Sequence, residues 1–230
     1  MKKIYFILAV LCSSFYLSSC EQNELVDSPP SMKFNYQGNL YTSNYQVVNG
    51  KTTYSNDGVA KIQEKLSQNL ELATLVSEDG SCIYFDNYEA LTNYLKQKEM
   101  IESNTIPTTR AGANTCTIGL YANTKYKGTK KIFTSSSAQK SAAYSDLSTL
   151  GLLNAISSIK INTNYFNYVD NGGVTLWENK NFSGRSITWR TTRNSNNPIN
   201  IPNLENYALN LPPLLPKSWN DAAQSAQVGF

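Results

Sequence analysis

The C-terminal half of this 230-residue chain repeats a short pattern of aromatic residues and glycine, and this repeat restricts the possible folds. The pattern is an aromatic residue, a second aromatic residue five positions later, and a glycine two positions after that. It occurs at Tyr121, Tyr126 and Gly128 and, 56 positions later, at Trp177, Phe182 and Gly184. Strands are expected on both sides of each copy, at 117–120, 130–133, 174–176 and 186–189. Such a period predicts two duplicated hairpin units that bury one another, and the glycine supplies a backbone position without a side chain.

The repeated pattern resembles the Greek-key motif of the βγ-crystallin family, which reads aromatic, four residues, aromatic, any residue, glycine. Two Greek keys form one domain in that family, so the resemblance implies a two-Greek-key β-sandwich over 115–230. Chance tyrosine- and glycine-rich hairpins in an unrelated β-sandwich are the alternative. With the segment that precedes it, the expected fold class is mainly β, with a small α+β domain before the sandwich.

Many microbial members of that family bind Ca²⁺ through a loop written Asn/Asp, Asn/Asp, two residues, Ser/Thr, Ser. The resemblance places this loop at 153–158 and 220–225, with the candidate ligands Asn154, Ser157, Ser158, Asn220, Asp221, Gln224 and Ser225. Leu153 departs from the first loop and Gln224 from the second. Because Ca²⁺ takes six to eight oxygen ligands, these departures predict weak or single-site binding. Loops with a purely structural role are the alternative.

The N-terminus has the pattern of an export signal. Two lysines precede an apolar run over 4–11 that is too short to span a membrane, and small residues lead to Cys20. Leu17-Ser18-Ser19-Cys20 resembles the lipobox of bacterial lipoproteins, which implies a signal peptide over 1–19, lipidation of Cys20 and an acylated tether over 20–32. We therefore expect an outer-membrane or cell-surface protein, with release into the extracellular space or vesicles. A plain secretory signal is the alternative.

The segment 33–100 is expected to form a small acidic α+β domain. Asn49-Gly50 predicts a hairpin turn, Val59, Ile62, Leu66 and Leu70 a helix, 72–76 and 81–85 two strands, and 88–100 a closing helix. Residues 21–110 carry twelve acidic and seven basic side chains, whereas 111–230 carry five acidic and eleven basic ones. Opposite charges favour docking of the first half on the second, although neighbouring domains also differ in charge by chance.

The segment 101–114 separates the halves and has no hydrophobic periodicity. Such a linker gives proteases access, and Thr109-Arg110-Ala111 resembles the sites of Arg-specific cysteine proteases of Bacteroidales. Cleavage between Arg110 and Ala111 is therefore the expected processing step, and an ordinary linker that is not cut is the alternative. Cys82 and Cys116 lie on either side of this site, and in an oxidising compartment we expect a disulfide between them. Two unpaired thiols are the alternative.

This arrangement is similar to protease-activated antibacterial lipoprotein toxins (bacteriocin-like proteins) of gut Bacteroidales. The resemblance implies an activating Arg-specific protease and an anionic partner such as lipopolysaccharide or membrane. The expected contacts are Lys125, Lys127, Lys130, Lys131, Arg185, Arg190 and Arg193. Histidine is absent and no nucleophile motif is present, so we expect no enzyme activity, and we expect no nucleic-acid partner. The alternatives are a non-enzymatic calcium- or glycan-binding surface module and a protease inhibitor.

Overall fold

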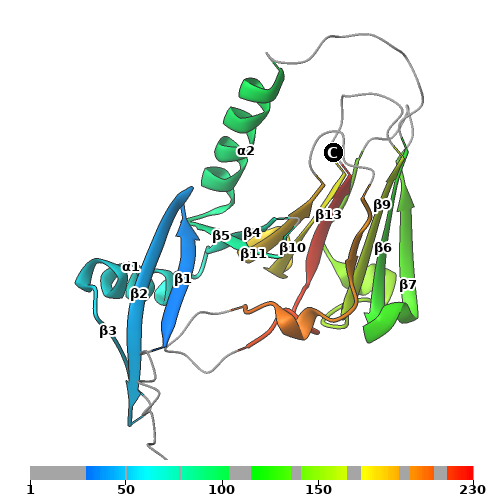
Figure 1. Ribbon diagram of the computed structural model, residues 1–230. Coiled ribbons are helices and arrows are strands. Elements are labelled where there is room, and N and C mark those ends of the chain that lie inside the picture. Colours follow the sequence, from blue (N-terminus) through cyan, green and yellow to red (C-terminus); the bar gives the residue numbers. More distant parts are fainter. Residues whose placement is uncertain are drawn as a thin grey trace, which may run out of the picture.

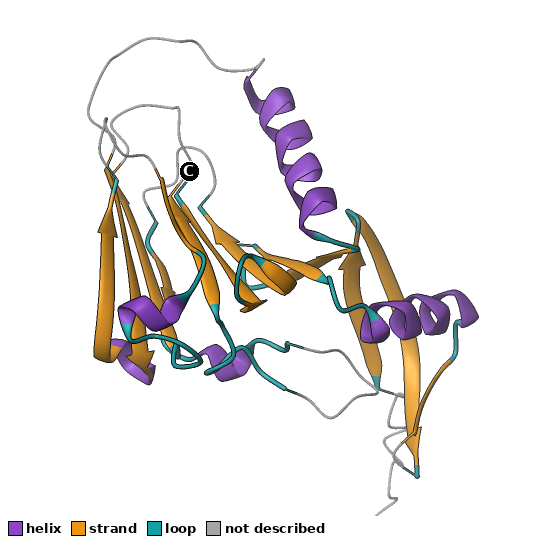
Figure 2. Ribbon diagram, turned by 180° about the vertical axis from the view of Figure 1, so that it is seen from behind, coloured by secondary structure: helices purple, strands orange, loops and turns teal. Residues whose placement is uncertain are grey.

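The structure is a computed structural model that describes residues 30–49, 51–77, 79–103, 115–135, 141–164, 172–191, 197–209 and 217–229. This part of the chain is mainly β, with two α-helices and two sheets, which confirms the expected fold class at that level. Strands dominate the C-terminal half, whereas the N-terminal half combines strands with both α-helices (Figure 2). Among the described residues, no helix has the length and apolar character needed to span a membrane.

The N-terminal half contains β1 (Ser31–Tyr36), β2 (Asn39–Val48), β3 (Lys51–Tyr54), α1 (Asp57–Gln68), β4 (Ala73–Val76), β5 (Cys82–Phe85) and α2 (Tyr88–Ser103). Strands β2 and β3 pair antiparallel on either side of the predicted turn, and Asn49 has a φ of 52°. The two predicted strands are also present: β4 and β5 pair antiparallel around Gly80. These turns form locally because Asn and Gly tolerate positive φ.

Helix α1 begins at a side-chain cap. The Asn56 side-chain oxygen accepts hydrogen bonds from the backbone N–H groups of Gly58 and Val59, at 2.9 and 3.3 Å. The helix buries Val59 and Leu66 as predicted. The prediction that Leu70 belongs to this helix is wrong, because the backbone leaves helical geometry at Asn69 and the Leu70 side chain is 68% exposed.

The C-terminal half contains β6 (Thr115–Asn123), η1 (Thr124–Tyr126), β7 (Lys127–Thr134), β8 (Ser141–Tyr144), η2 (Leu147–Leu150), β9 (Ser158–Asn164), β10 (Gly173–Asn179), β11 (Ser183–Arg190), β12 (Ile199–Ile201), η3 (Leu204–Asn206) and β13 (Ser225–Gly229). One four-stranded sheet has the order β12-β9-β6-β7. The strands β11, β10, β13 and β8 lie next to one another in the other sheet. The four-stranded sheet takes β6, β7 and β9 from the first repeat and β12 from the second. The four neighbouring strands of the other sheet are β10, β11 and β13 from the second repeat and β8 from the first.

A single hydrophobic core lies between these two sets of strands. Ile118, Leu120 and Ile161 face it from the four-stranded sheet, and Leu176 and Ile187 face it from the other. All five side chains are almost fully buried. Neither repeat could bury this apolar surface alone, which explains why the two repeats form one unit.

The two halves of the chain share one nine-stranded sheet, of order β3-β2-β1-β5-β4-β11-β10-β13-β8 (Figure 1). Strand β4 from the N-terminal half pairs parallel with β11, from Ala73 opposite Ser186 to Val76 opposite Trp189. The sequence predicted two docked domains but gave no sign of a continuous sheet. All four residues of β4 are buried, as expected for a strand inside a parallel pairing.

Candidate functional site

The two repeats form hairpins with the same backbone geometry. Two consecutive residues in each turn have positive φ, and the repeat glycine follows: Lys125 (56°), Tyr126 (62°) and Gly128 (78°), and Asn181 (57°), Phe182 (58°) and Gly184 (79°). The aromatic rings also correspond. Tyr121 and Tyr126 meet edge to face with centroids 5.7 Å apart, and Trp177 and Phe182 do so at 5.3 Å. The pattern therefore encodes one folded hairpin twice.

A buried serine fastens each hairpin. Ser158 Oγ donates to the carbonyl oxygen of Asn123 at 2.7 Å and accepts from the Tyr126 N–H at 3.0 Å. Ser225 Oγ donates to the Asn179 carbonyl at 2.6 Å and accepts from the Phe182 N–H at 3.0 Å. Both serines are fully buried, and both were predicted as Ca²⁺ ligands. Because the hydroxyls already bond to the hairpins, a Ca²⁺ ion would have to compete for them.

The two predicted calcium loops contact each other. Asp221 N–H donates to the Ile156 carbonyl at 3.1 Å, and Asn154 N–H donates to the Ala223 carbonyl at 3.0 Å. Ser157 Oγ lies 2.8 Å from Asp221 Oδ1 and 2.8 Å from the Ala122 carbonyl. We call Asp221, Ser157 and the Ala122 carbonyl the oxygen cluster. It brings together two of the predicted ligands from different repeats.

The oxygen cluster only partly meets the requirements of Ca²⁺. It contains one carboxylate, and Asn220 Nδ2 donates to the other oxygen of that carboxylate at 2.9 Å. The described residues contain no group of three or more His, Cys, Asp and Glu side chains placed to hold a metal. Hydroxyl and carbonyl oxygens are still ligands that Ca²⁺ accepts. Calcium binding thus stays a prediction, with Asp221 and Ser157 as the ligands that the geometry favours. Gln224 follows Asp221 by three positions, and its N–H donates to the Trp177 carbonyl.

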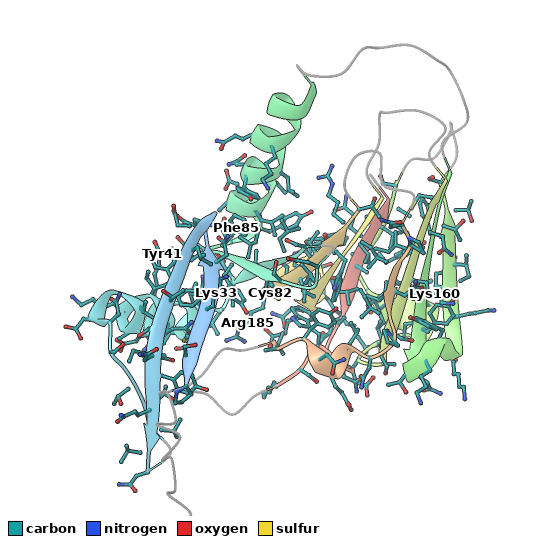
Figure 3. The ribbon with its side chains drawn as sticks, viewed as in Figure 1. Lys33, Tyr41, Cys82, Phe85, Lys160 and Arg185 are labelled. Atoms are coloured by element: carbon teal, nitrogen blue, oxygen red, sulfur yellow. The ribbon has the colours of Figure 1, made fainter. Side chains whose placement is uncertain are left out.

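The structure divides the predicted basic contacts into two groups. Lys125, Lys127, Lys130 and Lys131 lie on η1 and on β7, an edge strand of the four-stranded sheet. Arg185 and Arg190 lie on β11 in the other sheet, and Figure 3 shows Arg185 well separated from Lys160 of the four-stranded sheet. The predicted contacts that the structure describes therefore come from two different sheets.

Arg185 is a poor candidate for contact with an external partner. Its side chain is only 12% exposed, and its Nη1 lies 3.3 Å from Glu178 Oε2. The lysine group is more accessible, because Lys125, Lys127 and Lys130 are exposed. Lys160, which the sequence did not single out, extends this group, and its Nζ lies 4.2 Å from the centroid of the Tyr126 ring. Lysines on an edge strand also discourage pairing with other strands, which is their structural explanation.

The contact between the two halves of the chain, here called the seam, extends beyond β4 and β11. The Tyr88 ring at the start of α2 meets the Trp177 ring edge to face, with centroids 5.0 Å apart. Val76 is 2% exposed and belongs to the C-terminal core. Leu72 accepts a hydrogen bond from Ser186 N–H at 2.9 Å. The first half thus covers the β11 edge and part of the repeat hairpin at once.

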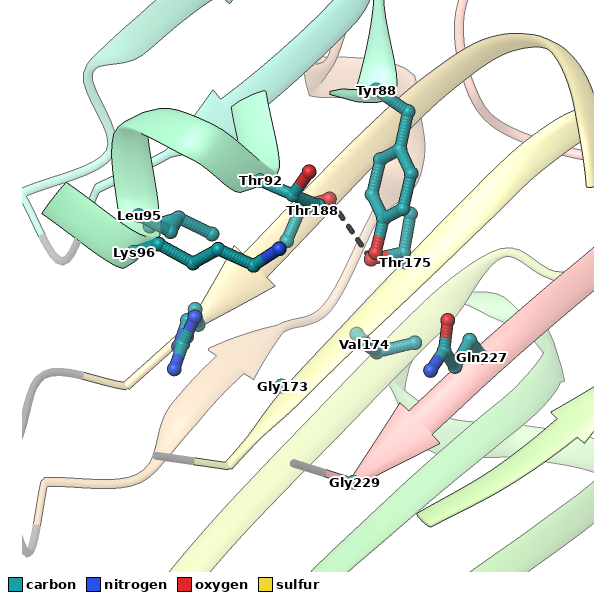
Figure 4. A pocket seen from close by; sticks show the side chains of 11 residues that line it. Tyr88, Thr92, Leu95, Lys96, Gly173, Val174, Thr175, Thr188, Gln227 and Gly229 are labelled. Carbon is teal, nitrogen blue, oxygen red and sulfur yellow. Dashed lines mark hydrogen bonds between the residues drawn. The ribbon is translucent and has the colours of Figure 1, made fainter. Parts of the chain in front are cut away.

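A cavity of about 270 Å³ lies under α2 on the face of the sheet (Figure 4). Tyr88 and Lys96 line it from the helix, and Arg190 lines it from β11. Thr175 and Thr188 form part of its floor, with their hydroxyls 2.9 Å apart. One of the predicted basic contacts, Arg190, therefore lines a cavity that α2 of the N-terminal half also lines.

The predicted disulfide is absent, since Cys82 and Cys116 are both free thiols. They lie in different sheets: Cys82 begins β5, whereas Cys116 lies on β6 with no exposed surface. Both contact the C-terminal core. Burial raises the pKa of both thiols, and that of Cys116 reaches about 12. The structure thus has the alternative arrangement, in which two unpaired thiols pack as small apolar side chains.

Four predicted functional residues, Cys20, Arg110, Ala111 and Arg193, lie outside the described residues. Comparisons with protein-family models, with curated proteins and with solved structures found no match. The geometry above is therefore the basis for any functional conclusion.

Proposed function

We propose that this chain is the precursor of an antibacterial lipoprotein, in which the N-terminal half masks a basic C-terminal module until proteolysis after Arg110. The observation that carries the proposal is the parallel pairing of β4 with β11, because it makes the first half occupy an edge strand of the second. An edge strand is a natural site for pairing with another chain, so covering it is an effective way to keep a binding module inactive.

We also propose that the C-terminal half is a βγ-crystallin-like domain with two Greek keys. The supporting observations are the paired hairpins with equivalent aromatic contacts, the buried serine that is hydrogen-bonded to each hairpin, and the exchange of β8 and β12 between the sheets. The domain would act by binding: Lys125, Lys127 and Lys130 of η1 and β7, which are exposed while the halves are docked, would attract an anionic target surface, and the β11 edge would engage the target once it is uncovered.

The seam predicts that cleavage by itself does not separate the halves. Burial of a valine side chain such as Val76 is worth about 1.5–3 kcal/mol, and an aromatic pair such as Tyr88 and Trp177 adds about 0.5–1.5 kcal/mol. These contacts persist after the 110–111 bond is broken. Release therefore requires a partner that competes for β11 or for the hairpin, which would make activation depend on the target surface.

The proposal is tested with purified protein, an Arg-specific protease and sensitive bacteria. Wild type should be cut after Arg110 and should then kill; Arg110→Lys, which keeps the charge but not the cleavage site, should stay intact and harmless. Killing by intact Arg110→Lys protein would refute proteolytic activation.

Tyr88→Ala should speed separation of the cleaved halves in size-exclusion chromatography. Tyr94→Ala is the matched control, because its ring contacts Phe85 within the N-terminal half.

A second candidate function is a calcium-dependent surface-binding module. The oxygen cluster is the observation that favours it, since Asp221 and Ser157 come from the two loops that bind Ca²⁺ in the family that the sequence resembles. Calcium-dependent attachment of intact, uncleaved protein to cells would support this function over the first.

A further inference from the structure

We propose that a hollow at one end of the seam binds an uncharged sugar unit of a surface polysaccharide. The hollow lies between the β4–β5 turn of the N-terminal half and the segment 197–207 of the C-terminal half, and its volume is about 510 Å³. Small-molecule sites in proteins span roughly 300–1,000 Å³, so a ligand of one or two sugar units is appropriate in size. No part of this hollow belongs to the oxygen cluster or to the lysines of β7.

The back of the hollow is a fixed pair of aromatic rings. Trp189 and Tyr207 meet edge to face with centroids 5.2 Å apart and an interplanar angle of 88°. Trp189 is 1% exposed and is held in the sheet opposite Val76, the last residue of β4. Tyr207 is partly buried and is one of the residues that line the hollow. Aromatic side chains with a polar end are well suited to ligands that have both apolar and hydroxyl-bearing faces.

The rim of the hollow supplies hydrogen-bonding groups of both kinds. Asn197 and Asn200 contribute amides, Ser77 a hydroxyl and Asp79 a carboxylate. An amide side chain both donates and accepts, whereas a carboxylate only accepts, so together they match a row of sugar hydroxyls. Asp79 is held in place, because its Oδ1 accepts from Ser81 N–H at 2.9 Å and from Ser81 Oγ at 2.7 Å.

The charge on the described lining of the hollow disfavours anionic ligands. Among the described residues that line it, Asp79 is the one charged side chain. The cavity under α2 differs in this respect, since Lys96 and Arg190 line it. An acidic sugar, a phosphate or a carboxylate would meet the negative charge of Asp79 with no cation among the described lining residues to offset it. An uncharged polyhydroxylated ligand has no such penalty.

Both halves of the chain build the hollow, so a bound sugar would contact both and favour the docked arrangement. This consequence distinguishes the hollow from a site on one domain. It also makes the ligand a regulator: polysaccharide of the producing cell would help to keep the halves together.

The test uses the mature full-length chain with glucose, galactose, mannose, N-acetylglucosamine and their trisaccharides, followed by saturation-transfer NMR and calorimetry. At least one of these sugars should bind. Asn200→Ala and Asp79→Ala, one from each wall, should each weaken binding about tenfold, as expected for the loss of one or two hydrogen bonds. Asn162→Ala is the matched control, because Asn162 is an exposed asparagine on neighbouring strand β9, and it should bind as wild type does.

Two further results decide the ligand class. Glucuronic acid should not bind wild type, and Asp79→Asn should reduce the discrimination between glucuronic acid and glucose. The proposal is overturned if none of the sugars binds at concentrations of tens of millimolar, or if both wall variants bind as tightly as wild type. It is also overturned if glucuronic acid binds wild type better than the neutral sugars do. Because Asn200 and Asp79 are exposed, both variants should fold. Circular dichroism of each variant checks that weaker binding is not caused by unfolding.

Discussion

Ser157 donates a hydrogen bond from Oγ to Oδ1 of Asp221 across 2.8 Å, although the two residues belong to different repeats. The same hydroxyl lies within 2.8 Å of the Ala122 carbonyl at the end of β6. Three oxygen atoms from separate parts of the C-terminal half therefore converge at one point. The repeat-equivalent positions are Asn154 for Asp221 and Gln224 for Ser157, and this second pair provides no carboxylate.

This asymmetry predicts one weak calcium site. Calorimetric titration should detect one ion per chain, with a dissociation constant of about 10⁻⁴–10⁻³ M, the range of extracellular modules. Asp221→Ala should abolish binding, because it removes the carboxylate of the oxygen cluster. Asn154→Ala is the matched change at the other loop and should leave binding intact. Equal loss in both variants would show that the two loops contribute alike, contrary to the prediction.

The repeat glycines should resist substitution for two separable reasons. Gly184 has a φ of 79°, and a Cβ there would lie 2.5 Å from Asn179 Nδ2. Gly80 has a φ of 81°, but a Cβ there would meet nothing within 4 Å. Gly80→Ala should therefore lower the free energy of unfolding only by the left-handed backbone penalty, about 1–2 kcal/mol. Gly184→Ala should lower the free energy of unfolding by about 1–3 kcal/mol more.

Urea denaturation of the two glycine variants measures these costs. The clash is isolated by repeating Gly184→Ala in an Asn179→Ala background, where the obstructing amide is gone. There the substitution should cost no more than Gly80→Ala does. If Gly184→Ala lowers the free energy of unfolding equally with and without the Asn179 amide, that amide is not the obstacle. Crowding by other neighbours must then explain the loss.

The hairpins were predictable from sequence because their determinants are local. A positive φ at Gly128 and Gly184 and an aromatic contact five residues apart follow from a dozen neighbouring residues. The continuous sheet was not predictable. Strand β4 was recognised as a strand, but a short run of buried residues does not specify its neighbour, and β11 lies more than a hundred positions away.

The candidate site was predictable to a similar, limited extent. The resemblance singled out Ser157 and Asp221 as candidate ligands in two separate loops, whereas their contact with each other is a finding of the structure. It could not show that Ser158 and Ser225 fasten the hairpins, because this depends on hydroxyl geometry in the folded state. The basic residues were grouped by net charge alone, and the strand order then placed Lys130 and Arg185 in different sheets.

Both thiols should be present and slow to react in native protein that begins after Cys20. The thiolate is the reactive form, and burial raises the pKa of both cysteines, to about 12 for Cys116. Iodoacetamide at about pH 8 should label partly exposed Cys82 before fully buried Cys116. Mass spectrometry of labelled protein assigns each site. Denatured, unreduced protein should take up two labels; uptake of none would restore the predicted disulfide.

The ion pair between Asp146 and Lys180 should make stability depend on pH in the acidic range. Asp146 Oδ2 accepts from Lys180 Nζ at 2.7 Å, and Oδ1 accepts from Ser148 N–H at 2.9 Å. The Lys180 bond, followed by the Ser148 bonds, lowers the pKa of Asp146 from its ordinary value to about 2. Because the pKa of the folded state is below that of the unfolded state, the stabilisation is complete above about pH 4 and is lost as the pH falls towards 2.

Lys180→Ala removes the largest cause of that shift, so its free energy of unfolding should fall less than that of wild type between about pH 5 and pH 2. Urea denaturation at a series of pH values measures the two slopes. Lys130→Ala removes the same charge from exposed strand β7 and should keep the slope of wild type, which separates the specific pair from a change in net charge. Parallel slopes for Lys180→Ala and wild type would mean that the pair contributes nothing, as many exposed ion pairs do.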